Sequence, residues 1–331
     1  MRRIVLFHRH ELEMAMEYVP MKISFVIPCY RSVATIESVV DEIQLKVAER
    51  PDVSHEIVLV NDASPDDLPD TLLRLCESRP SCTMIELAKN ANRPGAVMAG
   101  LARMTGDVAI VMDDDGQCPM ECLWELLAPL AGDADVSIAK YPERKQSRFK
   151  DGATWLNRKM TEIALQKPRD LEFTNFMAMK KSVVDELVRY DNPYPYLTGL
   201  LLRTTKHIVN VPMEQRERQA GTTTFTFRKM VALWVNGLTA FSILPLRVAS
   251  FCGIASAIVG FLLGLYTVIH KLVSPNVQAG YSSTVALLLF IGGLILLSLG
   301  IIGEYIGRIY MCINRSPQYV VRRVENSRGQ E

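Results

Sequence analysis

Two long stretches near the carboxyl end of the chain carry no charged side chain, and they constrain the fold more than any other feature. They are residues 248–269 and residues 284–302, and both consist almost entirely of apolar and small residues. A helix that crosses the ~30 Å hydrocarbon core of a bilayer needs about 20 such residues. Two buried core helices are the alternative, which the length and the glycine content of the stretches disfavour. We therefore expect a two-span transmembrane hairpin over residues 244–310.

Basic residues are distributed unevenly around this hairpin. The short connection between the two stretches holds His270 and Lys271, whereas the flanks carry Arg247, Arg308, Arg315, Arg322 and Arg323. The cytoplasmic flanks of membrane helices are enriched in Lys and Arg. We therefore expect a multi-pass protein of the cytoplasmic membrane, with the connection outside and both termini in the cytoplasm.

The remaining composition excludes several classes of protein. A net charge of +1 gives no reason to propose a nucleic-acid partner. The seven cysteines are scattered, and Cys118 and Cys122 are interpreted as ordinary small residues, so a reducing setting is favoured over a disulfide framework or a zinc site. Residues 1–20 lack the apolar core of a signal peptide and precede a second methionine, Met21. They are expected to be a disordered extension or an upstream start-codon artefact.

Between residues 22 and 211, short apolar runs alternate with amphipathic helical segments. Strands are expected at residues 22–28, 56–60, 83–87, 108–112, 136–139 and 208–211, and helices at residues 35–50, 68–77, 96–104, 155–165 and 196–206. This alternation is typical of an α/β protein with a doubly wound, mainly parallel sheet. We expect that domain over residues 21–226, an amphipathic interfacial helix over residues 227–243, and a cytoplasmic tail over residues 311–331.

Three consecutive aspartates, Asp113, Asp114 and Asp115, follow the expected strand at residues 108–112, and Gln117 comes two residues later. Ligands of open α/β sheets bind outside the carboxyl ends of the strands. Carboxylate oxygens at such a place suit Mg²⁺ or Mn²⁺, which typically sits on the phosphate oxygens of a nucleotide. A solvated acidic turn is the alternative interpretation.

Four short motifs lie at the expected strand ends: Pro28-x-Tyr30, Asn61-Asp62-Ala63-Ser64, Asn90-x-x-Arg93-Pro94-Gly95 and Asp113-x-Asp115-x-Gln117. As a set they resemble the family 2 glycosyltransferases of the GT-A fold. Residues 303–310, GEYIGRIY, together with the two apolar stretches, resemble the polyprenyl-phosphate subgroup, such as bactoprenol glucosyltransferases and dolichyl-phosphate mannose synthases. The resemblance covers residues 22–324 and implies a GT-A-type catalytic domain followed by the interfacial helix and two transmembrane helices.

The resemblance implies a nucleotide site between the first two strand ends. The implied nucleotide-binding residues are Pro28, Tyr30, Asp62, Asn92, Arg93 and Asp113. Tyr30 would stack on the base, with packing on the sheet edge as the alternative. Arg93 would neutralise phosphate charge, with a solvated loop arginine as the alternative. Arg31-Ser32 stands where the family usually has Asn-Glu, which leaves the donor open.

The resemblance further implies that the acidic strand end binds metal and sugar. Asp115 and Gln117 are expected to reach a Mg²⁺ or Mn²⁺ ion, while Asp113 contacts the sugar or orients the site. Asp114 stands where alanine is usual, and we expect it to point away because neighbours along an extended segment alternate sides. The ion would hold the donor diphosphate and stabilise charge on the leaving nucleotide.

The acceptor side is assigned by the family motif Arg-x-x-Gly-x-Ser-x-Tyr, in which Arg218 fits the arginine and Thr223 the serine. Arg218 is chosen for the acceptor phosphate because a guanidinium matches phosphate geometry. General contact with lipid headgroups is its alternative. The expected catalytic residues are therefore Asp113, Asp115 and Arg218.

No general base can be assigned from the sequence. Relatives carry an aspartate near residues 170–175, and two alignments place either Asn175 or Leu171 at that position. A polyprenyl phosphate is already ionised at neutral pH and has no proton that must be removed. Positioning and electrostatics would then supply most of the catalysis.

The resemblance implies inverting transfer of a sugar from a nucleoside-diphosphate sugar, expected to be UDP-linked, to undecaprenyl phosphate at the cytoplasmic face of a bacterial inner membrane, for modification of the cell envelope. The alternatives are a GDP-mannose or UDP-aminosugar donor, a sugar hydroxyl as acceptor, and a degenerate non-catalytic nucleotide-binding scaffold. A transporter is disfavoured because the spans lack interior charge. Gly292-Gly293 and Gly300 would permit the close helix contacts of a homo-oligomer.

Overall fold

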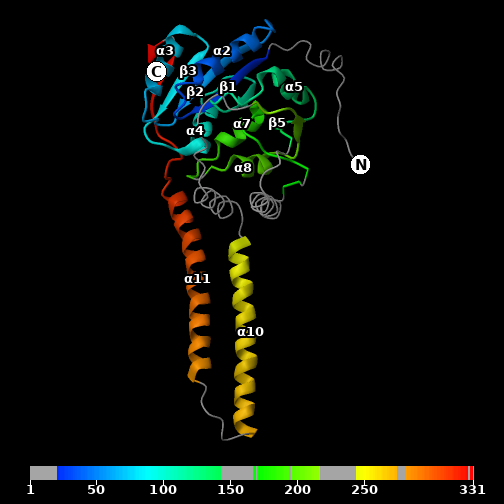
Figure 1. The fold of residues 1–331 in the computed structure, drawn as a ribbon, viewed down its shortest axis with the longest axis vertical. Helices are drawn as coiled ribbons and strands as arrows, with labels where there is room; N and C mark the ends of the chain where they lie inside the picture. Colours follow the sequence, from blue (N-terminus) through cyan, green and yellow to red (C-terminus); the bar gives the residue numbers. More distant parts are fainter. Residues whose placement is uncertain are drawn as a thin grey trace. The chain divides into compact units, whose positions relative to one another are not determined.

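The computed structural model describes residues 21–142, 167–168, 170–193, 195–216, 244–273, 281–326 and 329–330 (Figure 1). The chain divides into two units. The first comprises Met1–Thr154, Lys167–Thr224 and Arg315–Glu331, and the second comprises Trp155–Gln166 and Phe225–Asn314. The expectations for residues 1–20, 155–165 and 227–243 lie outside the described residues, and so do Arg218 and Thr223.

Within the described residues, the first unit is built on one sheet with the strand order β7-β5-β6-β4-β1-β2-β3-β8-β9. Its strands are β1 Lys22–Cys29, β2 Ser54–Asn61, β3 Cys82–Leu87, β4 Val108–Val111, β5 Val136–Lys140, β6 Met177–Lys180, β7 Ile208–Pro212, β8 Val321–Asn326 and β9 Gly329–Gln330. The first four strands pair in parallel, whereas β6 lies antiparallel between β4 and β5. This mixed sheet confirms the α/β fold class, and it brings the carboxyl ends of β1, β2, β4 and β5 to one edge.

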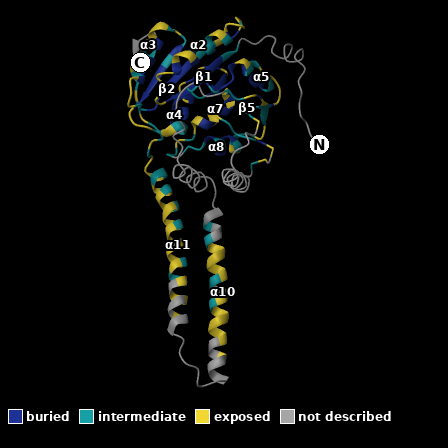
Figure 2. Ribbon diagram, viewed as in Figure 1, coloured by how far each residue is buried: buried dark blue, intermediate teal, exposed yellow. Residues whose placement is uncertain are grey.

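Helices cover both faces of the sheet. They are α2 Ile36–Val47, α3 Leu68–Ser78, α4 Asn92–Leu101, η1 Met120–Cys122, α5 Leu123–Leu127, η2 Ala128–Ala131, α7 Lys181–Val188 and α8 Leu197–Thr204. The apolar stripe that predicted α2 is buried, and it consists of Ile36, Val39, Val40, Ile43 and Val47. These residues share one hydrophobic core with apolar side chains of the central strands, α3 and α5 (Figure 2).

The helix α4 covers the opposite face and approaches the sheet unusually closely. Gly100 makes this approach possible, because a Cβ atom there would lie 2.4 Å from Val26 Cγ1 and 3.1 Å from Val60 Cγ2. α4 begins earlier than the predicted residue 96, at Asn92, so Arg93 belongs to its first turn. The close packing therefore fixes where that first turn meets the strand ends.

The carboxyl-terminal segment of the chain returns to the sheet. β8 pairs antiparallel with β3, and Val324 lies opposite Ile85. Glu86 of β3 is only 7% exposed, and its carboxylate accepts hydrogen bonds from Arg323 Nε at 2.5 Å and Arg322 Nη1 at 3.3 Å. The sequence predicts no strand in residues 311–331, yet β8 and β9 lie there and belong to the sheet of the first unit.

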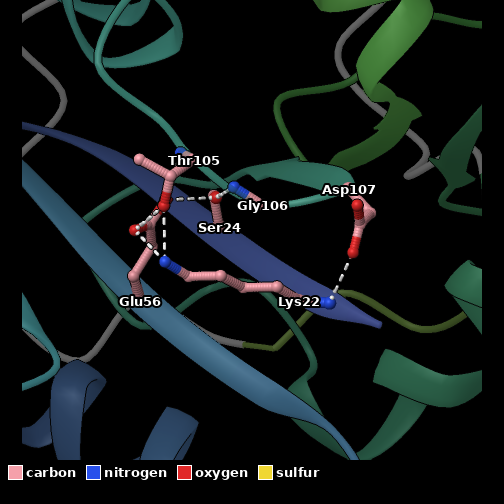
Figure 3. A network of polar contacts seen from close by, with 6 residues as sticks. All are labelled: Lys22, Ser24, Glu56, Thr105, Gly106 and Asp107. Carbon is pink, nitrogen blue, oxygen red and sulfur yellow. Dashed lines mark hydrogen bonds and ion pairs between the residues drawn. The ribbon is translucent and has the colours of Figure 1, made fainter. Parts of the chain in front are cut away.

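At the amino ends of β1, β2 and β4, a polar network ties the strands together (Figure 3). The Glu56 carboxylate lies 2.7 Å from Lys22 Nζ and accepts hydrogen bonds from Ser24 Oγ at 2.5 Å and from Thr105 Oγ1 at 2.6 Å. Burial would raise the pKa of Glu56, but these hydrogen bonds together hold it below its ordinary value. The network lies at the edge of the sheet opposite Asp113, Asp114 and Asp115, and it stabilises the ionised carboxylate of Glu56.

The second unit contains two long helices, α10 Leu244–Val273 and α11 Tyr281–Ile313. Each includes a window that is apolar and long enough to cross a membrane, Ala249–Tyr266 with a mean hydropathy of 1.9 and Phe290–Ile313 with 1.8. Neither window is buried. Arg308 Nη2 lies 2.8 Å from Glu304 Oε1, one helical turn away. The two apolar stretches of the sequence thus fall in the two helices.

Candidate active site

A cavity of about 310 Å³ opens at the edge of the sheet where β4 and β5 end. Its lining comes from residues after β4, after β5, before β6 and after β7, and includes Asp113, Gln117, Cys118, Tyr141, Phe173, Thr174, Asn175, Phe176 and Gln215. Two predicted site residues, Asp113 and Gln117, therefore share one cavity. The lining also combines aromatic rings with uncharged amides and a hydroxyl, which suits a polyhydroxylated ring better than a charged group.

Asp113 is held by two side chains from different elements. Its Oδ1 accepts a hydrogen bond from Arg93 Nε at 2.8 Å, and its Oδ2 accepts one from Asn175 Nδ2 at 2.7 Å. Arg93 Nη2 also donates to the carbonyl oxygen of Asn175 at 3.3 Å. The three residues form a closed triangle in which the guanidinium neutralises the carboxylate. This arrangement fits the orienting role expected for Asp113 better than a role as a metal ligand.

Asp114 faces the turn after β1. Its Oδ2 accepts the main-chain N–H of Tyr30 at 3.1 Å, and its carbonyl oxygen accepts the Thr35 hydroxyl at 2.6 Å. Burial raises the pKa of Asp114 to about 6, and the neighbouring charge of Asp113 adds to that shift. Asp114 thus differs in direction from Asp113, and it holds the turn that carries Tyr30. The sequence does not indicate this contact with the Tyr30 turn.

Asp115 and Gln117 form the turn that follows. Asp115 Oδ1 accepts the main-chain N–H of Gln117 at 3.2 Å, and Gly116 between them adopts a positive φ of 73°. Among the residues that the structure describes, no three His, Cys, Asp or Glu side chains gather as a metal site. Mg²⁺ is commonly bound through one or two protein oxygens, with substrate phosphates and waters completing its shell. One carboxylate and one amide oxygen fit such an ion and do not fit an all-protein cage.

Asp62 joins the end of β2 to the start of α4. Its Oδ1 accepts the main-chain N–H of Ala91 at 2.6 Å, and its carbonyl oxygen accepts Asn90 Nδ2 at 3.0 Å. Burial raises the pKa of Asp62 to about 6, although the N–H groups of Ala91 and Asn92 oppose that shift. Asp62, which is predicted to bind the nucleotide, therefore also positions the start of α4, whose first turn carries Arg93.

The other predicted nucleotide residues lie around the same strand ends. Tyr30 is 45% exposed, and the Arg31 guanidinium lies 5.5 Å from its ring centroid. Pro28 is buried inside β1, so it shapes the strand end and offers no exposed surface. Asn92 is exposed. Three non-glycine residues at these turns, Arg31, Ala63 and Asn92, adopt positive φ values of 58°, 51° and 60°. Strained backbone of this kind tends to cluster at functional sites.

Of the two positions considered for a general base, only one reaches the cavity. Asn175 lines it, whereas Leu171 is buried in the domain. The neighbouring Glu172 forms an ion pair with Lys140 at 2.9 Å. An amide at the cavity cannot accept a proton from a nucleophile as a carboxylate can.

Sequence reasoning missed the cavity residues Tyr141, Phe173 and Gln215 and the ion pairs of Arg216. Tyr141 follows the predicted strand at residues 136–139, so its place at a carboxyl strand end was an available signal. Phe173 precedes β6, a short strand that the sequence did not reveal. Burial raises the pKa of Tyr141, with the nearby Cys118, Asp113 and Asp115 adding to the shift, so its hydroxyl stays protonated.

Comparisons with known proteins agree with this geometry. The model of glycosyl transferase family 2 matches residues 24–188, and the model of the GtrB C-terminal hairpin matches residues 244–309. A prophage bactoprenol glucosyl transferase homolog of Escherichia coli (strain K12) is 30% identical over 92% of this chain and 100% of its own length. The undecaprenyl-phosphate 4-deoxy-4-formamido-L-arabinose transferase of Klebsiella pneumoniae is 27% identical over 92% of this chain and 93% of its own length.

A solved structure of glucosyl-3-phosphoglycerate synthase from Mycobacterium tuberculosis, in complex with Mn²⁺, UDP and phosphoglyceric acid, has the same fold. It is 18% identical, has a TM-score of 0.52, and the match covers 69% of this chain and 81% of that chain. The sheet, its strand-end cavity and these similarities define a glycosyltransferase of the GT-A class. The chain belongs to glycosyl transferase family 2, in the group that carries the GtrB-type C-terminal hairpin. The expectation of a family 2 enzyme of the polyprenyl-phosphate type is thereby confirmed.

Proposed function

We propose that this glycosyltransferase moves a sugar from a UDP-linked donor to undecaprenyl phosphate, with inversion, at the cytoplasmic face of a bacterial inner membrane. The observation that carries the proposal is the strand-end cavity, in which Asp113, Gln117 and Asn175 meet beside aromatic side chains. The bactoprenol and undecaprenyl-phosphate transferases among its relatives support the acceptor class. The product would serve modification of a cell-envelope glycan or lipid.

In this proposal the donor lies across the carboxyl ends of β1, β2 and β4. Tyr30 stacks on the base, Asp62 accepts a hydrogen bond from the base or ribose, and Arg93 faces the diphosphate. The contact between Arg93 and Asp113 supports this placement, because it holds a guanidinium within 2.8 Å of the carboxylate that borders the sugar cavity. UDP is the preferred nucleotide because the structural neighbour with the same fold was solved with UDP.

Asp115 and Gln117 would hold a Mg²⁺ or Mn²⁺ ion. When bound, such an ion supplies positive charge next to the donor diphosphate and so favours departure of the nucleotide. Asp113 orients the sugar through its fixed carboxylate. Asp114 keeps Tyr30 in place through the main-chain hydrogen bond at 3.1 Å. The three aspartates thus have different roles: Asp115 binds the metal, Asp113 orients the sugar, and Asp114 holds the tyrosine that stacks on the base.

The reaction needs no general base in this scheme. A phosphate oxygen of the acceptor attacks the anomeric carbon, the bond from that carbon to the β-phosphate oxygen of the donor breaks, and UDP leaves with its electron pair. The acceptor phosphate is already ionised, so no proton has to be removed. The amide of Asn175 at the cavity is consistent with this scheme. One in-line displacement inverts the anomeric configuration.

Arg218 is proposed as the ligand of the acceptor phosphate, with Thr223 beside it. Arg216 is the other arginine of that stretch, and its guanidinium is already paired with Glu42 and Glu121. A guanidinium with those partners is occupied, which favours Arg218 for the phosphate.

The sheet supports the proposed membrane orientation. β1 to β7 precede α10 and α11 in the chain, and β8 follows them, yet all belong to one sheet. One folded domain lies on one side of a membrane, so the helices between its strands must cross it an even number of times. Two spans with both flanks on the cytoplasmic side satisfy that condition.

The test is a nucleotide-release assay with purified full-length protein. The protein is incubated with Mg²⁺ or Mn²⁺ and one of UDP-glucose, a UDP-aminosugar or GDP-mannose, with undecaprenyl phosphate or without lipid. Lipid-dependent release of UDP, with a product of inverted anomeric configuration, is the expected result. Release of GDP would overturn the donor assignment, and equal release without lipid would overturn the acceptor assignment. A product with retained anomeric configuration would overturn the proposal of a single in-line displacement.

A further inference from the structure

Arg216 forms an ion-pair clamp just outside the sugar cavity. Its Nε donates to Glu121 Oε1 at 3.2 Å, its Nη2 donates to Glu121 Oε2, and its Nη1 donates to Glu42 Oε1. The bidentate pair with Glu121 is the strongest geometry for an arginine and a carboxylate. The clamp joins the segment after β7 to α2, which carries Glu42, and to η1, which carries Glu121.

The main chain at the same residue reaches the acidic strand end. The N–H of Arg216 donates to the carbonyl oxygen of Gln117 at 3.3 Å. Gln117 lines the cavity, and so does Gln215, the residue directly before Arg216. The positions of the Gln117 and Gln215 side chains in the cavity wall therefore depend on the position of Arg216.

We infer that Arg216, through Glu42 and Glu121, is a positioning residue that fixes Gln117 and Gln215 in the wall of the donor-sugar cavity. All three nitrogens of the Arg216 guanidinium donate to carboxylates. Arg216 therefore acts through these partners and does not contact the substrate. Burial would lower the pKa of Arg216, but the hydrogen bonds to Glu121 and Glu42 raise it, so the clamp stays charged. The inference rests on the proposed function, because its readout is transfer from the sugar donor.

The test compares Arg216→Met in the full-length protein with a matched control, Arg189→Met. Arg189 directly follows α7 and also pairs with a glutamate, Glu186, but its side chain is 75% exposed. Small displacements of positioning groups can lower turnover by up to about 100-fold. We expect Arg216→Met to lower kcat/KM for the UDP-sugar by about 10-fold or more, and to weaken inhibition by UDP, which lacks the sugar, by a smaller factor. Arg216→Lys should recover part of the loss, and Arg189→Met should leave both quantities as in the parent protein.

A double-mutant cycle separates positioning from direct contact with substrate. Glu42→Gln together with Glu121→Gln should lower kcat/KM about as much as Arg216→Met does, and adding Arg216→Met to that pair should cause little further loss. A further loss of full size would show that Arg216 binds substrate itself, and it would overturn the inference. Equal weakening of UDP and UDP-sugar would also overturn it. Failure of the parent protein to release UDP would instead count against the proposed function.

Discussion

The close contact of α4 with the sheet makes Gly100→Ala a sensitive test of the packing. In a helix interior, alanine is more favourable than glycine by about 0.5–1 kcal/mol. Overpacking a tight core costs about 1–3 kcal/mol. A Cβ atom at Gly100 would lie 2.4 Å from Val26 Cγ1 and 3.1 Å from Val60 Cγ2, and both valines are fully buried or nearly so. We therefore take the upper end of the overpacking cost and expect a net destabilisation of about 2 kcal/mol.

For a domain of this size, such a loss lowers Tm by about 4–8 °C. Thermal unfolding of the purified protein in detergent, followed by tryptophan fluorescence, measures it. Trp124 of α5 reports on the α/β domain. Gly132→Ala is the matched control, because Gly132 is exposed and its nearest contact would be Pro129 O at 3.7 Å. Val26→Ala should relieve much of the clash in the double variant. A Tm for Gly100→Ala equal to or above that of the parent would refute the reasoning, since helix propensity alone predicts that result.

Three further predictions concern single side chains. Asp115→Ala should abolish metal-dependent UDP release, and near-normal release in that variant would exclude Asp115 as the metal ligand. Arg218→Ala should raise KM for the lipid about 10-fold or more while leaving UDP binding intact, as expected when one charged hydrogen bond of about 1.5–3 kcal/mol is lost; equal loss of both would contradict its role. Because the pKa of Glu56 is lowered by folding, its contribution to stability is present above the ordinary value of 4.5 and is lost as the pH falls below it. Glu56→Gln should therefore be less stable than the parent protein at pH 7, and the difference should narrow as the pH falls below 4.5; a difference independent of pH would be inconsistent with an ionised Glu56.

The parts of the fold with regular apolar spacing could be predicted from the sequence. The parallel strands β1 to β4 are short β-branched or apolar runs, and α2 has a clear apolar stripe, so their positions agree with the structure within a few residues. The acidic turn after β4 was recognised because carboxyl strand ends bind ligands in such sheets.

The remaining elements gave weaker signals. β6 is four residues long and ends in a lysine, and β8 contains two arginines, which had been counted only as membrane-flanking charges. The clamp of Arg216 joins residues separated by 174 and 95 positions, and no local pattern reports such a contact. The direction of Asp114 was expected from strand alternation, but its hydrogen bond to Tyr30 depends on how β1 and β4 pair.

The return of β8 to the sheet sets an order of events during synthesis. Until the ribosome has made both apolar helices, β3 has no strand on its outer side, and the buried carboxylate of Glu86 lacks both of its arginines. An open strand edge invites pairing with other chains. A chain that stops before β8 would therefore leave an aggregation-prone, incomplete domain. Completion of the catalytic domain therefore follows the synthesis of α10 and α11, so the finished enzyme always carries both apolar helices.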